Sequence, residues 1–357
     1  MAKTTLSGPV ASQNGFVTPT YTSATLPYFE LGNMVVVSDL NTIAFGGVDQ
    51  WYDQRTGLGL GTGGNVGPGP TPPTPVIPKY PVTLGYINST GVVTDGPIKF
   101  SPDGTSYIYP SGPYLYQVEL GTPWDTASAL VPASYINLSS YFPAGEDVFA
   151  FAWNADGTYL NAIYGLTGMG TPCRFSVSTP FRVDTITGFE AAPSPFTASI
   201  TNAAGLTFSA DGMKAFTLGY SDLYQFNLTQ AYNFTTASNI PTASLNLGMQ
   251  LGAGSDSSYP RNVAFTSDGK IGFLFDGGST SGTQNGKVIQ FSLLTGFDLT
   301  TFVGYSNINF SSAFPGITIP YVSTSGVYLN ADNTKLMVNA LDVSFSPTMY
   351  NFTVTGS

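Results

Sequence analysis

The sequence predicts an all-β protein whose larger part is a five-bladed β-propeller, with six blades as the fallback. Five stretches share one pattern, in which an Asp-Gly or Asp-Asn turn joins two alternating apolar runs, as in "KFSPDGTSYIY" and "TFSADGMKAFTL". The turns are spaced by 53, 55, 57 and 64 residues. Such a period is typical of units that bury their faces only against neighbouring copies. The first residues of the five turns are Asp103, Asp156, Asp211, Asp268 and Asp332.

Four strands follow one another within the first repeat. We expect them at "PIKFS" (97–101), "SYIYP" (106–110), "YLYQVEL" (114–120) and, after a Thr/Ser-rich loop, "ASYINLSS" (133–140). Four antiparallel strands per repeat are the composition of a propeller blade. Gly, Pro and β-branched residues in every segment exclude a helical solenoid. If the longest spacing hides an extra hairpin, the ring has six blades.

The last repeat lacks a fourth strand, because its third strand is "MYNFTVTGS" at the end of the sequence. A strand-like stretch, "YPVTLGYINS" (80–89), stands unassigned before the first hairpin. Propellers often complete one blade with strands from both ends of the ring, which removes a free sheet edge. We therefore expect residues 80–89 to form the outer strand of the last blade.

The turn aspartates are interpreted as structural residues. A tight hairpin turn needs a residue with positive φ, which Gly supplies, and Asp bonds to its own backbone in such turns. Asn333 takes the Gly position in the fifth copy and also tolerates positive φ. Asp125, Asp184 and Asp298 follow an aromatic residue in the loop after the third strand. Because they repeat in register, we expect them to be structural as well.

The chain divides into three parts. Residues 1–57 are β-rich but short, so their core is marginal, and we expect it to be completed by other copies or by a larger assembly. Residues 58–79 are rich in Gly and Pro without apolar periodicity, which indicates a linker. Residues 80–357 carry the repeats and form the propeller.

Composition excludes several partners. Net charge is −10 with 11 Lys plus Arg and no basic run, so nucleic acid is not an expected partner. Cys173 is the only cysteine, which excludes an internal disulfide and a cysteine zinc site, and it is expected to be a half-buried strand residue. No apolar run has the length of a membrane span or a signal peptide, so we expect a soluble chain made in a cytoplasm.

The sequence offers little for catalysis, and no enzyme activity, cofactor or metal is predicted. There is no histidine, so Ser-His-Asp and Cys-His arrangements are excluded. A glycosidase needs two carboxylates across the scissile bond, yet the expected inner strands, read as apolar or neutral, carry no acid in the middle. A polysaccharide hydrolase or lyase is kept as an alternative, and calcium binding by Asp and backbone carbonyls stays open.

Aromatic residues in the loops after the third strands are the most distinctive remaining feature. Two interpretations are open for them, packing between neighbouring blades and stacking on sugar rings. The irregular loops at 165–172 ("GLTGMGTP") and 276–286 ("DGGSTSGTQNG") are further binding candidates, because repeat scaffolds vary in their loops. The candidate binding residues are Trp124, Met169, Phe181, Tyr232, Asp276, Gln284 and Phe297.

The opening of the chain resembles the N-terminal segment of tailed-bacteriophage virion proteins such as tail fibres and head fibres. The words "TLSGPVASQNGF", "ATLP", "MVVVSD", "IAF" and "WYD" carry the resemblance, which covers residues 5–53. One departure is "FGGVDQW", where that segment commonly has a Ser-Asp-Gly turn before the tryptophan. The phrase "FSPDGTSYIY" followed by "YLYQVELGTPWDTASA" is similar to propeller repeats of phage and bacterial surface proteins.

This resemblance implies a structural protein on the virion surface. The N-terminal unit would bind other virion proteins and would form a homo-oligomer, which in many such fibres is a trimer. The linker would hold the propeller outward. The propeller would bind the host surface, with a glycan as the expected receptor. A purely structural module that stabilises the capsid or tail is the alternative.

Overall fold

We analysed a computed structural model of the chain. It describes residues 20–21, 34–37, 42–46, 51–53, 59–61, 83–91, 98–143, 146–165, 170–193, 204–219, 222–248, 262–276, 286–309, 313, 326–341 and 346–355. The chain forms two compact units, Met1–Val76 and Ile77–Ser357.

The first unit contains one five-stranded sheet with the strand order β1-β2-β3-β4-β5. Strands β1 and β2 are parallel, and the other neighbours are antiparallel. Strand β2 is formed by the apolar run Met34–Val37. The strands are β1 (Thr20–Tyr21), β2 (Met34–Val37), β3 (Thr42–Gly46), β4 (Trp51–Asp53) and β5 (Gly59–Gly61).

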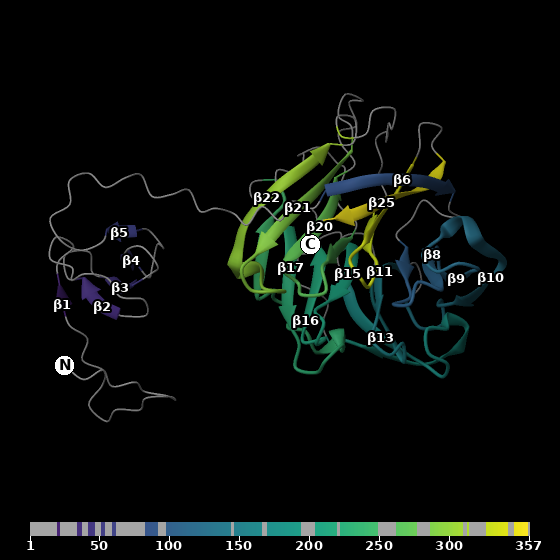
Figure 1. The fold of residues 1–357 in the computed structure, drawn as a ribbon. Coiled ribbons are helices and arrows are strands. Elements are labelled where there is room, and N and C mark those ends of the chain that lie inside the picture. The colour runs from purple at the N-terminus through teal and green to yellow at the C-terminus, as the bar shows by residue number, and fades with distance from the viewer. Residues whose placement is uncertain are drawn as a thin grey trace. The chain divides into compact units, whose positions relative to one another are not determined.

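The second unit is a ring of five four-stranded antiparallel sheets, which confirms the predicted five-bladed propeller (Figure 1). We number the blades in chain order. Blade 1 is β7 (Lys99–Phe100), β8 (Ser106–Ser111), β9 (Tyr114–Leu120) and β10 (Ala129–Asn137); blade 2 is β11 (Asp147–Trp153), β12 (Tyr159–Gly165), β13 (Thr171–Val177) and β14 (Ile186–Ala191); blade 3 is β15 (Ala204–Phe208), β16 (Lys214–Leu218), β17 (Asp222–Asn227) and β18 (Ala243–Asn246); blade 4 is β19 (Val263–Phe265), β20 (Ile271–Asp276), β21 (Lys287–Leu293) and β22 (Phe302–Asn309); blade 5 is β23 (Gly326–Leu329), β24 (Lys335–Leu341), β25 (Pro347–Thr355) and β6 (Thr83–Gly91).

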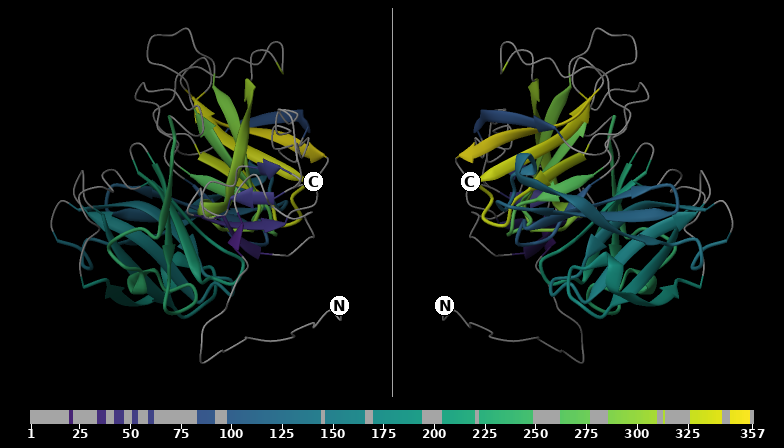
Figure 2. Two further views of the ribbon diagram at one scale, coloured as in Figure 1. Left: turned by 90° about the vertical axis from the view of Figure 1, so that its left-hand side faces the viewer. Right: turned by 90° about the vertical axis from the view of Figure 1, so that its right-hand side faces the viewer.

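Strand β6 completes blade 5 from the other end of the ring, the place that the sequence assigns to residues 80–89. It runs antiparallel to β25, from the pair Thr355 and Thr83 to the pair Thr348 and Gly91. The two strands lie side by side in both views of Figure 2. Blade 5 therefore has the same four-stranded construction as the other blades, with β6 covering the outer edge of β25.

Loops after the third strands are shorter than the sequence predicts. In blade 1 the loop ends in a single 3₁₀ turn, η2 (Thr126–Ser128), and β10 begins at the next residue, where Ala129 pairs with Leu120. The predicted fourth strand at 133–140 therefore starts too late. Corresponding 3₁₀ turns in the next three blades are η3 (Val183–Thr185), η4 (Phe234–Thr236) and η5 (Leu299–Thr301).

The apolar core lies between the blades. The described residues form five buried clusters, and each cluster joins two adjacent blades. Between blades 1 and 5, for example, Phe100 and Tyr107 pack with Tyr328 and Met337. Burial of each such side chain contributes roughly 1.5–3 kcal/mol, so a blade is stable only between two neighbours.

Candidate functional site

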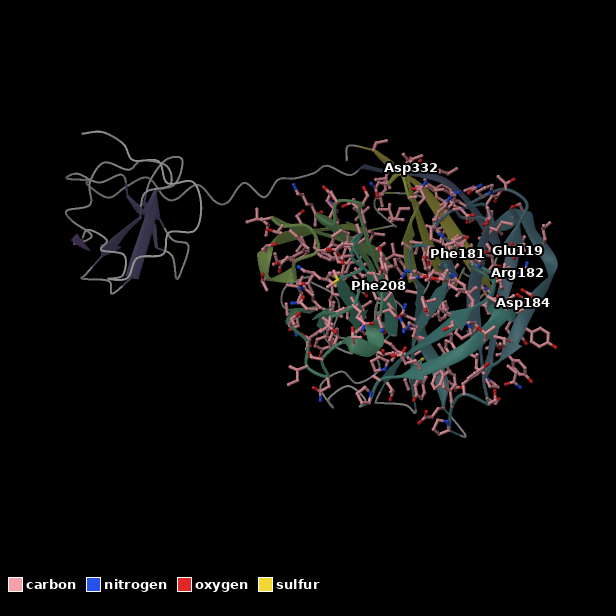
Figure 3. All side chains as sticks on the ribbon, turned by 90° about the horizontal axis from the view of Figure 1, so that it is seen from below. Glu119, Phe181, Arg182, Asp184, Phe208 and Asp332 are labelled. Atoms are coloured by element: carbon pink, nitrogen blue, oxygen red, sulfur yellow. The ribbon has the colours of Figure 1, made fainter. Side chains whose placement is uncertain are left out.

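The five hairpin turns are closed by the same hydrogen bond. The Asp Oδ1 atom accepts from the backbone N–H two residues later, at 3.0 or 3.1 Å in every blade. Hydroxyl donors lower the pKa of four of these carboxyls. Thr158 acts on Asp156, Ser209 on Asp211 and Thr334 on Asp332 (labelled in Figure 3). At Asp103 burial raises the pKa, but the hydrogen bonds from Ser101 and Thr105 outweigh it, so that this pKa is lowered as well. These bonds account for the aspartates as turn residues, as the repeat predicts.

Each loop aromatic lies directly over the glycine of its own turn. Trp124 packs on Gly104 and Tyr232 on Gly212, and a Cβ atom built on either glycine would lie 2.2 Å from the ring. The glycines have φ near +70°, so two independent constraints require glycine here. The four aromatics also have positive φ and donate their N–H to the glycine carbonyl: Trp124, Phe181, Tyr232 and Phe297.

In blade 5 the turn has Asn333 where the other four blades have glycine. Asn333 has φ +61°, as the turn requires. The described part of β25 runs to Thr355 with no aromatic loop against this turn, so a side chain fits there. That side chain joins blade 4, because its Nδ2 donates to Ser267 Oγ at 2.9 Å and its Oδ1 accepts from the Ser267 N–H at 3.1 Å.

Side chains from the preceding blade hold the aromatic loops in place. Gln117 of blade 1 donates to the Phe181 carbonyl and accepts from the Val183 N–H of blade 2, both at 2.9 Å. Two lysines do the same with their ammonium groups. Lys214 of blade 3 donates to the Phe297 carbonyl at 2.9 Å, and Lys335 of blade 5 donates to the Trp124 carbonyl at 2.6 Å.

The 3₁₀ turns explain the aspartates in these loops, with one exception. Asp125 and Asp298 each cap their turn by accepting from the N–H two residues later, at 3.0 and 3.1 Å. In blade 2 Arg182 stands at the cap position without a capping bond. Asp184 instead lies inside the turn and pairs with Arg182 at 2.8 Å, while Glu119 of blade 1 lies 3.6 Å from the same guanidinium (Figure 3).

The remaining candidates are scattered. Asp276 is buried in β20 and lies 3.4 Å from the Lys287 ammonium, so it is not part of an exposed loop. Met169, Gln284 and most of the two irregular loops lie outside the described residues. Cys173 is fully buried rather than half-buried, and burial raises its thiol pKa well above the usual value.

A cavity lies in the central channel, at the end that carries the Asp-Gly turns. Its volume is about 390 Å³, within the range of small-molecule pockets. All five inner strands line it, and three of the predicted aromatics stand at it: Trp124, Tyr232 and Phe297. Phe181 is not among its lining residues. The other described lining groups are mainly hydroxyls, amides and apolar side chains, without a carboxylate.

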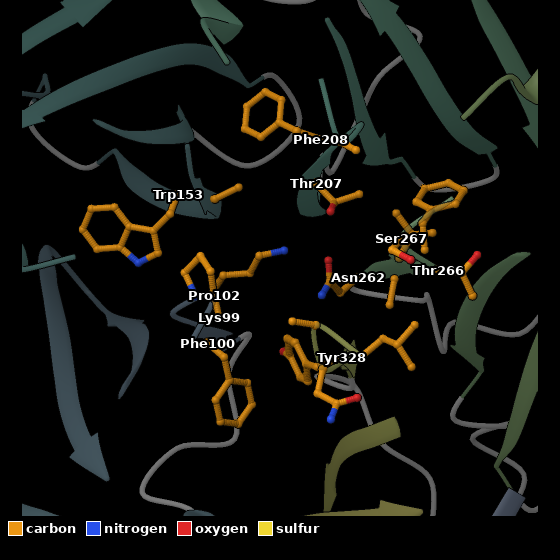
Figure 4. Close-up of a pocket in the computed structure, with 18 of the residues that line it drawn as sticks. Lys99, Phe100, Pro102, Trp153, Thr207, Phe208, Asn262, Thr266, Ser267 and Tyr328 are labelled. Atoms are coloured by element: carbon orange, nitrogen blue, oxygen red, sulfur yellow. The ribbon is translucent and has the colours of Figure 1, made fainter. Parts of the chain in front are cut away.

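Lys99 is the one charged residue among the described lining residues, and the reading of the inner strands as apolar or neutral is wrong at this position. It lies on β7 of blade 1, and its ammonium crosses the channel to donate to the Leu206 carbonyl of blade 3 at 3.2 Å. Figure 4 shows the side chain reaching into the middle of the cavity. Burial lowers the pKa of Lys99 to about 8.

Asn262 stands on the wall that faces Lys99 (Figure 4). Its side chain belongs to blade 4, and its Nδ2 donates to the Val327 carbonyl of blade 5 at 2.9 Å. The residue is only 5% exposed, yet its Oδ1 has no hydrogen-bond partner among the described residues. Lys99 and Asn262 also line a second cavity of about 10 Å³, roughly the space of one water molecule.

The fold and this cavity define a five-bladed propeller with a central pocket lined by both apolar and polar groups. No known family model matches the chain, and no curated protein matches it. Solved structures are similar at the level of the fold. A propeller domain of Cps50 (Swd1) from Myceliophteria thermophila has a TM-score of 0.38 and 11% identity, covering 72% of this chain and 70% of its own.

Two lactonase structures are similar to a comparable degree. A putative 6-phosphogluconolactonase from Bacteroides uniformis has a TM-score of 0.37 and 13% identity, covering 71% of this chain and 70% of its own. The periplasmic gluconolactonase PpgL of Pseudomonas aeruginosa has a TM-score of 0.40 and 12% identity, covering 86% and 76%. With identities of 12–13% and TM-scores of 0.37–0.40, these two structures say nothing about the activity of this chain. Its fold follows from its own strand topology.

Proposed function

We propose that the chain is a non-enzymatic binding protein of a phage particle and that the propeller binds a host-surface saccharide in its central pocket. The observation that carries the proposal is the lining of the pocket. Aromatic rings at Trp124, Tyr232 and Phe297 offer faces for sugar rings, while hydroxyl and amide groups offer hydrogen bonds. This combination suits a ligand with both apolar faces and many hydroxyls.

Binding is favoured over hydrolysis by the charges of the pocket. Glycoside hydrolysis by the usual mechanism needs a pair of carboxylates around the scissile bond. The described lining residues offer none, and the turn carboxylates are occupied by backbone and hydroxyl donors of their own turns. Within the part of the chain that the structure describes, we found no group of acidic and cysteine side chains placed to hold a metal ion.

Attachment to a particle rests on the resemblance of residues 5–53 to phage virion proteins and on the Gly/Pro-rich segment that follows. The separate first unit, Met1–Val76, is compatible with an anchor. Many tethered copies make weak saccharide binding effective, because the second contact is intramolecular on the particle. No helix of the described residues has the length and apolar character to cross a membrane.

Glycan-array binding by the full-length chain tests the pocket. Thr207→Tyr places a large side chain in the cavity, whereas Thr187→Tyr makes the same change on the exposed face of β14 and serves as the matched control. We expect saccharide binding that Thr207→Tyr abolishes and Thr187→Tyr preserves. Binding that survives Thr207→Tyr would place the ligand elsewhere, and the absence of any binding would favour the purely structural module.

Mass spectrometry of purified particles tests the location. We expect peptides of the chain in density-purified particles at a constant ratio to the major capsid protein. Peptides found only in the lysate that remains after particle removal would contradict a virion protein.

A further inference from the structure

The floor of the central pocket has an uncompensated positive charge. Among the described residues, Lys99 Nζ makes a single hydrogen bond, to the Leu206 carbonyl, although an ammonium group has three donors. Among the described residues no carboxylate lies within ion-pair distance of it. Lys99 is half-buried. Cations withdrawn from water are normally paired, so an unpaired one in a cavity points to a ligand that supplies the negative charge.

The position of this charge is unusual for the chain as a whole. Net charge is −10, and yet the one charged residue among the described lining of the central pocket is a cation. Equivalent inner-strand positions of the other blades carry uncharged residues, Ala152, Thr207, Ala264 and Tyr328. The repeat therefore does not require a lysine here, and blade packing does not explain it.

Asn262 supplies a second, independent observation. Its Oδ1 is buried and has no partner within the part of the chain that the structure describes, and the amide orientation is fixed by the bond from Nδ2 to the Val327 carbonyl. A buried acceptor without a partner costs about 1–3 kcal/mol, which a donor from a ligand would offset. A hydroxyl group is the donor that the pocket would find on a saccharide.

We propose that the pocket is specific for an acidic saccharide, whose carboxylate binds Lys99 Nζ while a neighbouring hydroxyl donates to Asn262 Oδ1. This inference rests on the proposed saccharide-binding function and adds the ligand class and the two residues that select it. The rings of Trp124, Tyr232 and Phe297 at the same cavity would contact the apolar face of the sugar ring. Neutral sugars use the aromatic wall but leave the Lys99 charge unpaired.

Calorimetric titration of the full-length chain with glucuronate and with glucose tests the proposal. The two probes differ chiefly in the carboxylate. We expect glucuronate to bind about 10- to 100-fold more tightly, the range of a hydrogen bond to a charged group. The preference should weaken as salt is added, because it depends on an ion pair.

Three variants complete the test. Lys99→Met should remove the preference for glucuronate while glucose binding persists, and Asn262→Asp, which adds a carboxylate to the pocket at constant size, should reverse it. Lys270→Met makes the same charge change at an exposed turn position and should leave the preference intact. Thermal melts verify that each variant folds.

Two outcomes would overturn the proposal in distinguishable ways. Equal affinity for glucuronate and glucose, or a preference that survives Lys99→Met, would refute the role of Lys99 and leave saccharide binding standing. If neither these sugars nor any glycan on the array binds, both the acidic ligand and the proposed function fail together.

Discussion

Replacement of Lys99 by methionine is expected to stabilise the ligand-free fold at neutral pH. The cause is the cost of holding a charge in the channel, which lowers the lysine pKa from 10.5 to about 8. A tenfold change in proton affinity corresponds to about 1.4 kcal/mol, so the full difference is roughly 3 kcal/mol. Because the pocket is open to water, we expect about 1–3 kcal/mol in favour of Lys99→Met at pH 7.

The pH dependence identifies the cause. Between pH 8 and 10.5 the unfolded chain holds the Lys99 proton and the folded chain releases it, so the stability of the wild type rises through this interval. Lys99→Met lacks this rise. The advantage of the variant should therefore be largest below pH 8 and disappear by about pH 10.5.

Urea unfolding of both proteins at pH 7, 9 and 10.5, followed by fluorescence, measures the difference at each pH. Other titrating groups, tyrosines included, are common to both proteins and cancel in the comparison. A variant that is less stable at pH 7, or a difference that does not change with pH, would refute the argument from burial.

Three further predictions concern the scaffold. Gly212→Ala should lower the free energy of unfolding in urea by about 2–4 kcal/mol, because the new Cβ atom would meet the Tyr232 ring. Gly112 also has positive φ but has nothing within 4 Å of a Cβ atom, so Gly112→Ala should cost only about 1 kcal/mol. Equal losses in the two variants would contradict the ring contact. Gln117→Leu should cost about 2–4 kcal/mol by leaving two backbone groups of the next blade unpaired, and a loss below 1 kcal/mol would show that they are solvated instead. The melting temperature should fall as the pH drops below about 4. The turn carboxyls with lowered pKa values stabilise the fold fully above the unfolded pKa of 3.8, and this stabilisation is lost as they become protonated in the folded protein. A constant melting temperature from pH 5 to pH 2.5 would exclude this contribution. Those carboxyls are Asp103, Asp156, Asp211 and Asp332.

The fold could be predicted from the sequence because it is repeated. One hairpin alone is ambiguous, but five in register indicate the period, the number of strands in a repeat and a ring of five blades, with six as the fallback until the structure is known. The unassigned strand-like stretch before the first hairpin indicates how the ring closes, and β6 has this place. Loop lengths were harder to predict. In blade 1 a single 3₁₀ turn comes just before β10, which begins at Ala129, and this turn has no strong sequence signal beyond its Asp125 cap.

The candidate site was harder to predict, for a physical reason. Loop aromatics were visible in the sequence because they recur, and recurrence indicates a structural role, here the contact with the turn glycines. Lys99 and Asn262 are each a single departure from an inner-strand pattern. They become a pair only when blades 1 and 4 face each other across the channel, which no local pattern encodes. Comparing equivalent positions of the five repeats for charge would have singled out Lys99.

Closure of the ring by β6 and β25 sets the order in which the protein can be completed during synthesis. Asn88 of β6 and its hydrogen-bond partner Asn351 are 263 positions apart. At about 5–20 residues per second, the ribosome needs on the order of tens of seconds to make the intervening chain. The first strand of the propeller to emerge is thus the last to find its partner, and until then the nascent chain presents two open sheet edges, one on β6 and one on the growing blades. A chaperone that shields β6 during this interval would act on the step most exposed to misassembly.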